Sequence, residues 1–412
     1  MPERRARPIL LVTNNLPPVL GGSAIVYDNL ARHAGGRVVV IAPTLNYLDG
    51  LPLIGWREHD RQAPYPVKRL RLLRTVMRDA TSPRLHALRL RLQDAVVRAR
   101  LLATLLRCIL FERAGAVCIG ELVASAWVLG VVRLFPWVSR AVYIHGEEIT
   151  TRDAYDVRLA RRRRALLRAH HVVAVSRFTA ATLAELMGEA ASARIRLIEN
   201  GVDVARFRPV ARQPGLLDLY GLHGQFVFVS VCRLLEKKGV DHAIAGFAAV
   251  VTQYPDTRYL VVGDGPYRAT LEALARTHAV ADKVVFTGAV GDDELIEHYA
   301  LGDVFVMPNR RLPNGDTEGF GLVFLEANAC GLPVIAGRDG GSIDAVRDGD
   351  NGLLVGGQSV DAITQAMLRL RTDAGLRERL RRNGLRTAAA ADWRHKSAAF
   401  LAMFDSGEHA PK

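Results

Sequence analysis

Short apolar segments alternate with segments of helical periodicity along the whole of this chain. Apolar runs of about four to eight residues without polar alternation are typical of strands buried on both faces of a parallel sheet. In the first half these runs are 8–13, 37–43, 116–120, 141–146, 171–176 and 194–200, and in the second half they are 225–232, 258–265, 283–288, 303–308, 332–337 and 352–355. The alternation predicts an α/β chain with two Rossmann-like, doubly wound parallel sheets.

Helical segments fit between the predicted strands. Ser23 and Ser176 suit the cap positions of two helices in the first half, the second of them covering 178–187. In the second half the predicted helices are about 238–253, 266–278, 292–301, 320–330, 342–347 and 360–372. Turn residues and prolines collect at 200–215, which divides the 412 residues into predicted domains 1–200 and 201–389. Because ligands of such sheets bind beyond the carboxyl ends of the strands, we expect an active site in the cleft between two domains.

Positive charge is concentrated in the first half of the chain. Residues 1–200 hold 31 Lys and Arg against 16 Asp and Glu, whereas the remaining residues hold 24 against 26. This asymmetry indicates two units with different partners. The four cysteines form no CxxC pair and no cluster with histidine at zinc spacing, so free thiols in a reducing cytosol are the simplest interpretation.

Two segments of the first half raise the question of a membrane. Residues 115–135 are apolar and long enough for a span, but Glu121 interrupts them, and their Gly and Ser content suits a buried strand and helix. Residues 81–113 place leucines at helical spacing with arginines between them. Such a helix either lies in an anionic lipid surface or packs on a sheet with its arginines in water, and the sequence leaves both open. Nucleic acid is another usual partner of such charge, but no recognised module or interleaved aromatic residue accompanies these arginines.

A glycine-rich turn into a helix, residues 316–337, carries the most specific chemical signal. Glu318 and Glu326 bracket the turn, and Gly319 and Gly321 remove side chains where a ligand would approach the exposed amides of the helix. Asp316 or Thr317 can cap this helix. At 1.5 Å per residue the two glutamates lie ~12 Å apart along the axis, which matches a sugar at one end of a diphosphate and a ribose at the other.

Two cations precede this turn in the second half. Arg233 follows a predicted strand and Lys238 begins the next helix, and together they suit a diphosphate, although a solvated basic loop would look the same in isolation. Gly263 lies in a tight turn from strand to helix. A glycine there indicates either that the backbone passes close to another group or only that the chain turns sharply. The chain has no good GxGxxG fingerprint, which counts against a dinucleotide-dependent oxidoreductase.

The segment "EGFGLVFLE" resembles the E-x7-E motif of retaining glycosyltransferases of family 4, whose fold is the two-domain GT-B type. The resemblance extends over most of the chain and includes "VSRFTAATL", "IENGVDVARFRP", "RLLEKKGVDHAI" and "GLPVIAGRDGGSIDAVRDGDNGLLV". The second half is most similar to phosphatidylinositol-mannoside mannosyltransferases and polysaccharide-assembly relatives. The resemblance also implies that a final helix, at about 390–406, crosses back to pack on the first domain.

The resemblance assigns roles to the residues of the second half. Arg233 and Lys238 would bind the donor diphosphate and stabilise the leaving nucleotide, without a metal. Glu318 would contact the hydroxyls of the donor sugar at the reacting centre, and Glu326 would hold the ribose. Backbone amides around Gly319, Phe320, Gly321, Leu322 and Val323 would hold the sugar and the phosphates, and the turn at Gly263 would border the donor.

In the first half the resemblance points to two sites. Gly21 and Gly22 precede a helix and would approach the phosphates of the donor or the acceptor, whereas a purely structural turn would need the same glycines. His145 follows a strand and would orient the donor sugar, and a structural histidine is the alternative. Glu147 or Glu148 is a weaker candidate for a contact with the acceptor, and Glu147 is the kind of carboxylate that serves as an acceptor base.

The resemblance, together with these residues, implies a metal-independent, retaining hexosyltransferase without a cofactor. It would move an α-linked hexosyl group, preferably mannosyl from GDP-mannose, to a lipid-linked or glycan acceptor in the assembly of cell-envelope glycans or glycolipids. UDP-sugars stay open as donors, and so does a non-catalytic scaffold that binds sugar nucleotides. We expect a cytoplasmic protein held at the inner face of the plasma membrane by its basic first domain, with no nucleic-acid partner.

Overall fold

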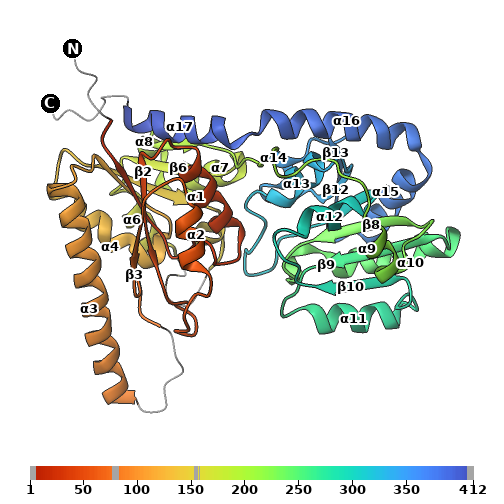
Figure 1. Cartoon of the computed structure of the whole chain (residues 1–412), viewed down its shortest axis with the longest axis horizontal. Coiled ribbons are helices and arrows are strands. Elements are labelled where there is room, and N and C mark those ends of the chain that lie inside the picture. The colour runs from red at the N-terminus through yellow and green to blue at the C-terminus, as the bar shows by residue number, and fades with distance from the viewer. Residues whose placement is uncertain (1–5, 77–82, 153–155, 157, 406–412) are drawn as a thin grey trace. The chain divides into compact units, whose positions relative to one another are not determined.

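The computed structural model describes residues 6–76, 83–152, 156 and 158–405 (Figure 1). The chain forms two compact units. The first consists of Met1–Val175, Ala180–Ile198 and Trp393–Lys412, and the second of Ser176–Thr179 and Glu199–Asp392. Residues 81–82 of the predicted basic helix and residue 406 of the predicted last helix lie outside the described residues.

The first unit is built on a parallel sheet of seven strands in the order β3-β2-β1-β4-β5-β6-β7. The strands are β1 (Ile9–Val12), β2 (Val38–Pro43), β3 (Val67–Leu70), β4 (Ala116–Ile119), β5 (Ser139–Ile144), β6 (His171–Ala174) and β7 (Ile195–Leu197). Ile9 of β1 is paired with Val38 of β2 on one side and with Ala116 of β4 on the other. The strand order therefore reverses between β1 and β4, as in a Rossmann sheet.

Helices connect these strands. They are α1 (Gly22–Arg32), α2 (Trp56–Gln62), α3 (Pro83–Leu110), α4 (Leu122–Val132), α5 (Glu147–Thr150), α6 (Ala160–Leu166), α7 (Arg177–Met187) and α8 (Glu189–Ser192). The apolar segment 115–135 is thus a buried strand followed by a separate helix. No helix within the described ranges is long and apolar enough to cross a bilayer.

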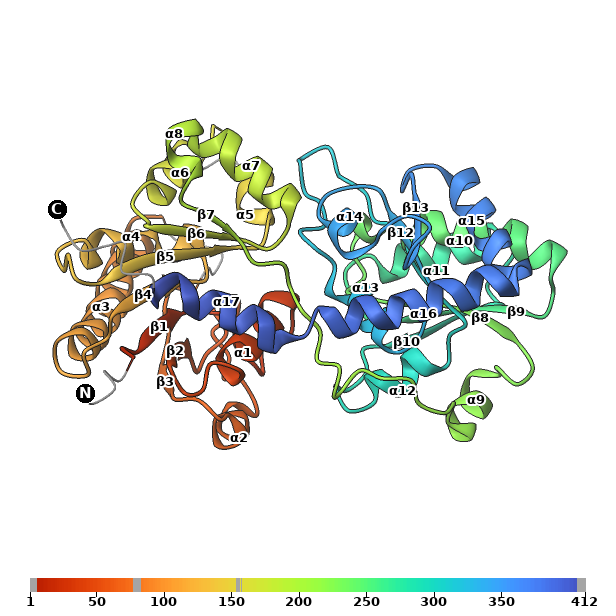
Figure 2. The ribbon, with the colours of Figure 1, turned by 90° about the horizontal axis from the view of Figure 1, so that it is seen from above.

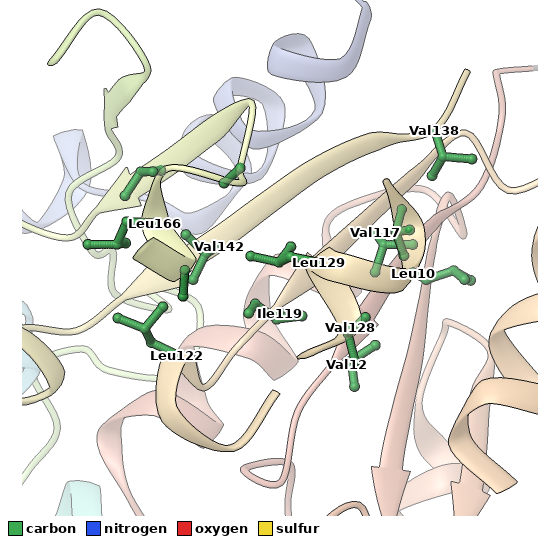
Figure 3. Packing of buried hydrophobic residues seen from close by; sticks show 14 of the residues in the cluster. Leu10, Val12, Val117, Ile119, Leu122, Val128, Leu129, Val138, Val142 and Leu166 are labelled. Atoms are coloured by element: carbon green, nitrogen blue, oxygen red, sulfur yellow. The ribbon is translucent and has the colours of Figure 1, made fainter. Parts of the chain in front are cut away.

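The core of the first unit lies between its sheet and the helices that follow the strands. Figure 3 shows the packing of Leu10, Val12, Val117, Ile119, Val142, Val128, Leu129 and Leu166. Each such side chain contributes about 1.5–3 kcal/mol when it leaves water. The later turns of α3 join this core through Leu101, Leu105 and Ile109, so that part of the helix packs as an ordinary amphipathic helix does.

The second unit has a parallel sheet of six strands in the order β10-β9-β8-β11-β12-β13. The strands are β8 (Phe226–Val231), β9 (Thr257–Val262), β10 (Val284–Gly288), β11 (Val304–Met307), β12 (Val334–Gly337) and β13 (Gly352–Val355). The remaining elements are α9 (Pro214–Tyr220), η1 (Glu236–Lys238), α10 (Val240–Gln253), α11 (Arg268–Thr277), α12 (Leu295–Ala300), α13 (Leu322–Ala329), α14 (Ser342–Ala345), α15 (Val360–Thr372) and α16 (Ala374–Ala390). This order is that of a dinucleotide-type sheet, and it reverses between β8 and β11.

The last helix, α17 (Trp393–Asp405), belongs to the first unit and lies along α1 (Figures 1 and 2). Phe400 is fully buried there, and Oγ of Ser397 donates a hydrogen bond of 2.9 Å to the carbonyl of Leu30. Arg37 forms an ion pair with Asp405 near the end of the helix. The end of the chain thus completes the unit in which the chain begins.

Some predicted elements differ from the structure. Strand β3 was not predicted, because "VKRL" is only half-buried at the edge of the sheet and carries two charges. Helix α1 begins at Gly22 with Gly21 at its cap position, so Ser23 lies inside the helix and is not its cap. Ser176 does cap α7, since its Oγ accepts a hydrogen bond of 3.0 Å from the amide of Thr179.

Candidate functional site

The carboxyl edge of the second sheet brings predicted residues together where the strand order reverses. The loop after β8 carries Arg233 and Lys238, and the segment between β11 and α13 carries Glu318. Since β8 and β11 are neighbours in the sheet, both segments leave the same edge. Ligands of doubly wound sheets bind at this position.

Lys238 and Glu318 form an ion pair that is largely shielded from water. Nζ of Lys238 lies 2.5 Å from Oε2 of Glu318, and the two side chains are 15% and 14% exposed. Burial opposes the charged form of both groups, but their mutual attraction outweighs it, so the pKa of Lys238 is raised and the pKa of Glu318 is lowered. The pair therefore stays ionised at neutral pH.

Arg233 precedes Lys238 by five residues, but unlike Lys238 it is exposed to solvent. Its side chain is exposed, and it forms no ion pair with any described residue. The loop after β8 passes very close to the end of β9. A Cβ on Gly263 would lie only 2.0 Å from the carbonyl oxygen of Cys232. The glycine at 263 is thus explained by a close approach of two backbones, at the residue before Arg233.

Two further ion pairs fix the turn that carries Lys238. Nζ of Lys237 lies 2.7 Å from Oδ1 of Asp316, which ties η1 to the segment before Glu318. Arg310 donates two hydrogen bonds of 2.7 Å to the carboxylate of Asp241, and its amide donates to the carbonyl of Lys237 at 2.9 Å. Such a bidentate pair holds two chain segments in one geometry. No sequence pattern separates Lys237 or Arg310 from the many other cations of this chain.

The start of α13 is built differently from the prediction. The helix begins at Leu322, and its cap residue is Gly321 in the left-handed conformation, without a side-chain cap. The expected caps are wrong, because Asp316 pairs with Lys237 and Oγ1 of Thr317 donates to Asp339 at 2.6 Å. The predicted ~12 Å separation of Glu318 and Glu326 assumes eight helical residues. Four of these residues precede the helix, so the helical rise does not give the distance between the two carboxylates.

Two backbone amides at this helix start have no acceptor within the helix. The amides of Leu322 and Val323 lie in the first turn of α13, where no carbonyl of the helix can accept from them. Gly319 and Phe320 connect Glu318 to the cap. A Cβ on Gly321 would lie 2.5 Å from the ring of Phe324, so this glycine is also required by packing inside the turn.

Glu326 is buried and does not join the pair. Its Oε2 accepts a hydrogen bond of 2.8 Å from the hydroxyl of Tyr299, and burial raises its pKa to about 7. Oε1 accepts no hydrogen bond from the described residues. A buried carboxylate with one oxygen occupied and one open is suited to accept from a hydroxyl group.

In the first unit, His145 follows β5 and is held by Tyr27 of α1. The hydroxyl of Tyr27 donates to the carbonyl of Gly120 at 2.6 Å and lies 2.8 Å from Nε2 of His145. Because that hydroxyl proton is used, we assign the ring proton to Nε2, which leaves Nδ1 as an acceptor. Burial lowers the pKa of His145 to about 4, so the ring is neutral at pH 7.

The other candidates of the first unit lie near the same edge of its sheet. Glu147 is exposed, whereas its neighbour Glu148 accepts from the amides of His145 and Gly146 at 3.2 and 3.0 Å. Burial raises the pKa of Glu148 to about 7. Gly21 caps α1 with a φ of 149°, and Gly22 is the first helical residue.

Sequence reasoning missed a carboxylate at the reversal point of the first sheet. Glu121 follows β4 and accepts hydrogen bonds from Oγ1 of Thr13 at 2.7 Å and from the amide of Asn14 at 3.0 Å. The signal was available, because Thr13 follows "ILLV" directly and Glu121 follows "AVCI" after a single glycine. Within the described ranges, no three His, Cys, Asp or Glu side chains converge in a way that could hold a metal ion.

Comparison with protein families decides the assignment of the chain. The family model "Glycosyltransferase Family 4" matches residues 20–206, and the model "Glycosyl transferases group 1" matches residues 221–387. The chain belongs to glycosyltransferase family 4. The first match covers β2 to β7 of the first sheet and the second covers all six strands of the second sheet, so the fold and the family agree in each unit.

Two relatives of this family 4 chain are named as mannosyltransferases. A GDP-mannose-dependent α-(1-6)-phosphatidylinositol monomannoside mannosyltransferase of Mycolicibacterium smegmatis is 42% identical over 48% of this chain and 51% of its own length. The Mycobacterium tuberculosis protein of that name is 40% identical over 58% of this chain and 63% of its own. The matches thus span between about half and three fifths of these relatives.

Solved structures share the fold of this family member over nearly the whole chain. Anabaena HepE, crystallised with UDP and glucose, has a TM-score of 0.74 at 19% identity and covers 97% of this chain and 100% of its own. Sucrose-phosphate synthase of Thermosynechococcus elongatus has a TM-score of 0.74 at 22% identity and covers 97% and 98%. At such identity the likeness concerns the GT-B fold.

Proposed function

We propose that this chain is a retaining glycosyltransferase that moves an α-linked hexosyl group from a nucleotide-sugar to a hydroxyl of a lipid-linked or glycan acceptor. Mannosyl from GDP-mannose is the preferred donor group, because the similar mannosyltransferases are named as GDP-mannose-dependent. The acceptor would then belong to the assembly of cell-envelope glycans or glycolipids.

The pair of Lys238 and Glu318 at the reversal point of the second sheet carries this proposal. A diphosphate that approaches this edge offers Lys238 a second anion, and the exposed guanidinium of Arg233 can take the other phosphate. Glu318 then keeps an oxygen for the hydroxyls of the sugar. In this arrangement both cations stabilise the negative charge that grows on the leaving nucleotide.

The start of α13 extends the donor site. The free amides of Leu322 and Val323 can donate to phosphate oxygens, and the positive end of the helix favours negative charge. Gly319 and Phe320 would present their backbone to the sugar. Oε1 of Glu326 is the acceptor that we assign to a ribose hydroxyl, and Tyr299 fixes the orientation of that carboxylate.

The chemistry follows from these charges. The bond between the anomeric carbon and the diphosphate oxygen breaks, and the acceptor oxygen attacks from the same face, so the configuration is retained. The departing diphosphate accepts the proton of the acceptor hydroxyl. We assign His145 the task of orienting the donor sugar, with Nδ1 as the acceptor for a sugar hydroxyl. Gly21 and Gly22 are proposed to border the phosphates.

We further propose a peripheral association with the inner face of the plasma membrane. The excess of 31 Lys and Arg over 16 Asp and Glu in residues 1–200 favours an anionic surface. The acceptor of the similar mannosyltransferases is named as a phosphatidylinositol mannoside, which is a membrane lipid.

A panel of nucleotide-sugars tests the proposed function. The protein is incubated with GDP-mannose, UDP-glucose, UDP-galactose or UDP-N-acetylglucosamine, with and without a membrane extract, and the product is analysed by NMR for its anomeric configuration. We expect transfer from GDP-mannose with an α product. A β product contradicts retention, and consumption of no donor by the wild-type protein favours the non-catalytic scaffold.

A further inference from the structure

The first unit has a basic hollow at the edge of its sheet where β5, β6 and β7 begin. This basic hollow has a volume of about 860 Å³ and is lined by Arg133, Arg140, Arg168, Arg194, Arg196 and His170, together with Leu167 and small residues. None of its lining residues is acidic. The volume lies in the range of small-molecule sites.

The basic hollow is distinct from the residues proposed for glycosyl transfer. Arg140 is the second residue of β5, and His145 follows the last residue of the same strand. Five residues at about 3.3 Å each separate them by ~16 Å along the strand. The hollow therefore opens at the amino edge of the sheet, whereas the predicted first-unit residues lie at its carboxyl edge.

The guanidinium groups of the basic hollow are held in position by carbonyl oxygens. Nε of Arg140 donates to the carbonyl of Arg168 at 2.9 Å, and its Nη2 donates to Nε2 of His170 at 2.5 Å. Nη1 of Arg194 donates to the carbonyls of Leu167 and Ala169 at 2.9 and 3.3 Å. Arg196 is oriented in the same way by the carbonyl of Ala193.

These contacts orient the cations but do not neutralise them. Within the described part of the chain, none of the five arginines has a carboxylate at ion-pair distance. Burial and the nearby charges of Arg133 and Arg194 lower the pKa of Arg140, although a guanidinium stays charged. A half-buried cation among like charges is unfavourable unless an anion compensates it. An arrangement of fixed forks with free N–H groups is the geometry that phosphate oxygens prefer.

We propose that the basic hollow is a binding site for a phosphate-bearing anion, of the class of pyrophosphates and phosphomonoesters. Arg140 and Arg194 provide the oriented forks, and Arg133 adds the charge at the rim. The phosphate belongs either to a soluble metabolite or to a lipid headgroup. The lipid source is included because Leu134 and Trp137, on the loop that begins with Arg133, are 76% and 53% exposed.

Charge reversal at the rim tests this site in the full-length protein. Arg133→Glu/Arg194→Glu changes two exposed arginines of the hollow, and the matched control Arg91→Glu/Arg100→Glu changes two exposed arginines of α3 by the same net charge. Pyrophosphate is titrated calorimetrically into each protein. Sedimentation with phosphatidylcholine vesicles, with and without phosphatidylinositol phosphate, provides the lipid arm. Far-UV circular dichroism verifies that each variant is folded.

The two arms separate the sources of the phosphate. We expect the hollow variant to lose one pyrophosphate site or to bind it about 100-fold more weakly, because two charge-assisted contacts are removed, while the control binds as wild type. Loss of vesicle binding alone supports a lipid headgroup as the source. The proposal is overturned if the hollow variant binds both ligands as wild type, or if the control loses as much. Wild type, the hollow variant and the control all keep Arg233 and Lys238, so any pyrophosphate bound there is the same in all three. The comparison therefore remains valid even if the protein shows no transferase activity.

Discussion

Nζ of Lys238 lies 2.5 Å from Oε2 of Glu318, although the two residues are 80 positions apart in the sequence. Each group supplies the counter-charge that the other needs in a setting largely shielded from water. A pair of this kind contributes little to stability as a whole, but the removal of one partner leaves an uncompensated charge. We therefore infer that this ion pair serves the proposed ligand binding more than the stability of the fold.

Variants of this pair separate stability from transfer. Lys238→Ala and Glu318→Ala should each reduce kcat/KM by about 100-fold or more, since each removes a charge from the proposed reacting centre. Each should also lower the free energy of unfolding by about 3–5 kcal/mol. The double variant Lys238→Met/Glu318→Leu should recover most of the stability but none of the transfer. Thermal unfolding and donor-consumption assays measure the two effects, and near-normal transfer by the double variant contradicts the assigned site.

Tyr27 should act on transfer only through His145. Tyr27→Phe removes the hydroxyl that fixes the ring proton on Nε2, so we expect kcat to fall about tenfold with little change in the KM of the donor. ¹⁵N NMR of the imidazole should show a mixture of tautomers. Tyr143→Phe is the matched control, because the ring of Tyr143 packs 5.3 Å from that of His145, whereas its buried hydroxyl has no hydrogen-bond partner among the described residues. Equal loss of kcat in both variants contradicts the role of the hydroxyl.

The fold was predictable because its strands are buried on both faces. "ILLV" and "VVVIAP" are continuous apolar runs, and the structure buries every residue of both. Strand β3 escaped prediction because its four residues "VKRL" are half-buried at the edge of the sheet and show no such run. The strand order, with its reversals, also cannot be read from local pattern, since it depends on which strands pair across distant parts of the chain.

The candidate site was predictable only in part. Arg233, Lys238 and Glu318 stand in recognisable segments, so their residue types and positions after strands indicated a shared edge. The pairing of Lys237 with Asp316 and of Arg310 with Asp241 was not predictable, because charged residues are frequent and each pair joins segments at least 69 positions apart. The cap of α13 was mispredicted because Asp316 and Thr317 have partners outside the helix that local rules do not include.

The stability of the protein should fall as the pH rises from about 4.5 to about 7. Burial raises the pKa of Glu148 and of Glu326 to about 7, from 4.5 in the unfolded chain. In that interval the folded state binds more protons than the unfolded state, so each rise in pH favours unfolding. The quantity to compare is the free energy of unfolding of Glu326→Gln minus that of wild type. This difference should be about 1–3 kcal/mol more favourable to the variant at pH 8 than at pH 4. Urea unfolding at both pH values measures this difference, and the exposed Glu185→Gln should show none.

The C-terminal helix should contribute to the stability of the first unit through Phe400. This side chain is fully buried, its ring lies 6.3 Å from that of Tyr143, and neighbouring Ser397 hydrogen-bonds to Leu30 of α1. Phe400→Ala should lower the free energy of unfolding by about 3–5 kcal/mol, because it removes a large side chain and leaves a cavity. Phe111→Ala is the matched control, since Phe111 is 81% exposed and its loss should change stability by less than about 0.5 kcal/mol. Denaturant unfolding of both variants measures the effect. Equal stability of the two would mean that α17 contributes nothing to the fold of the unit, in contradiction to its packing.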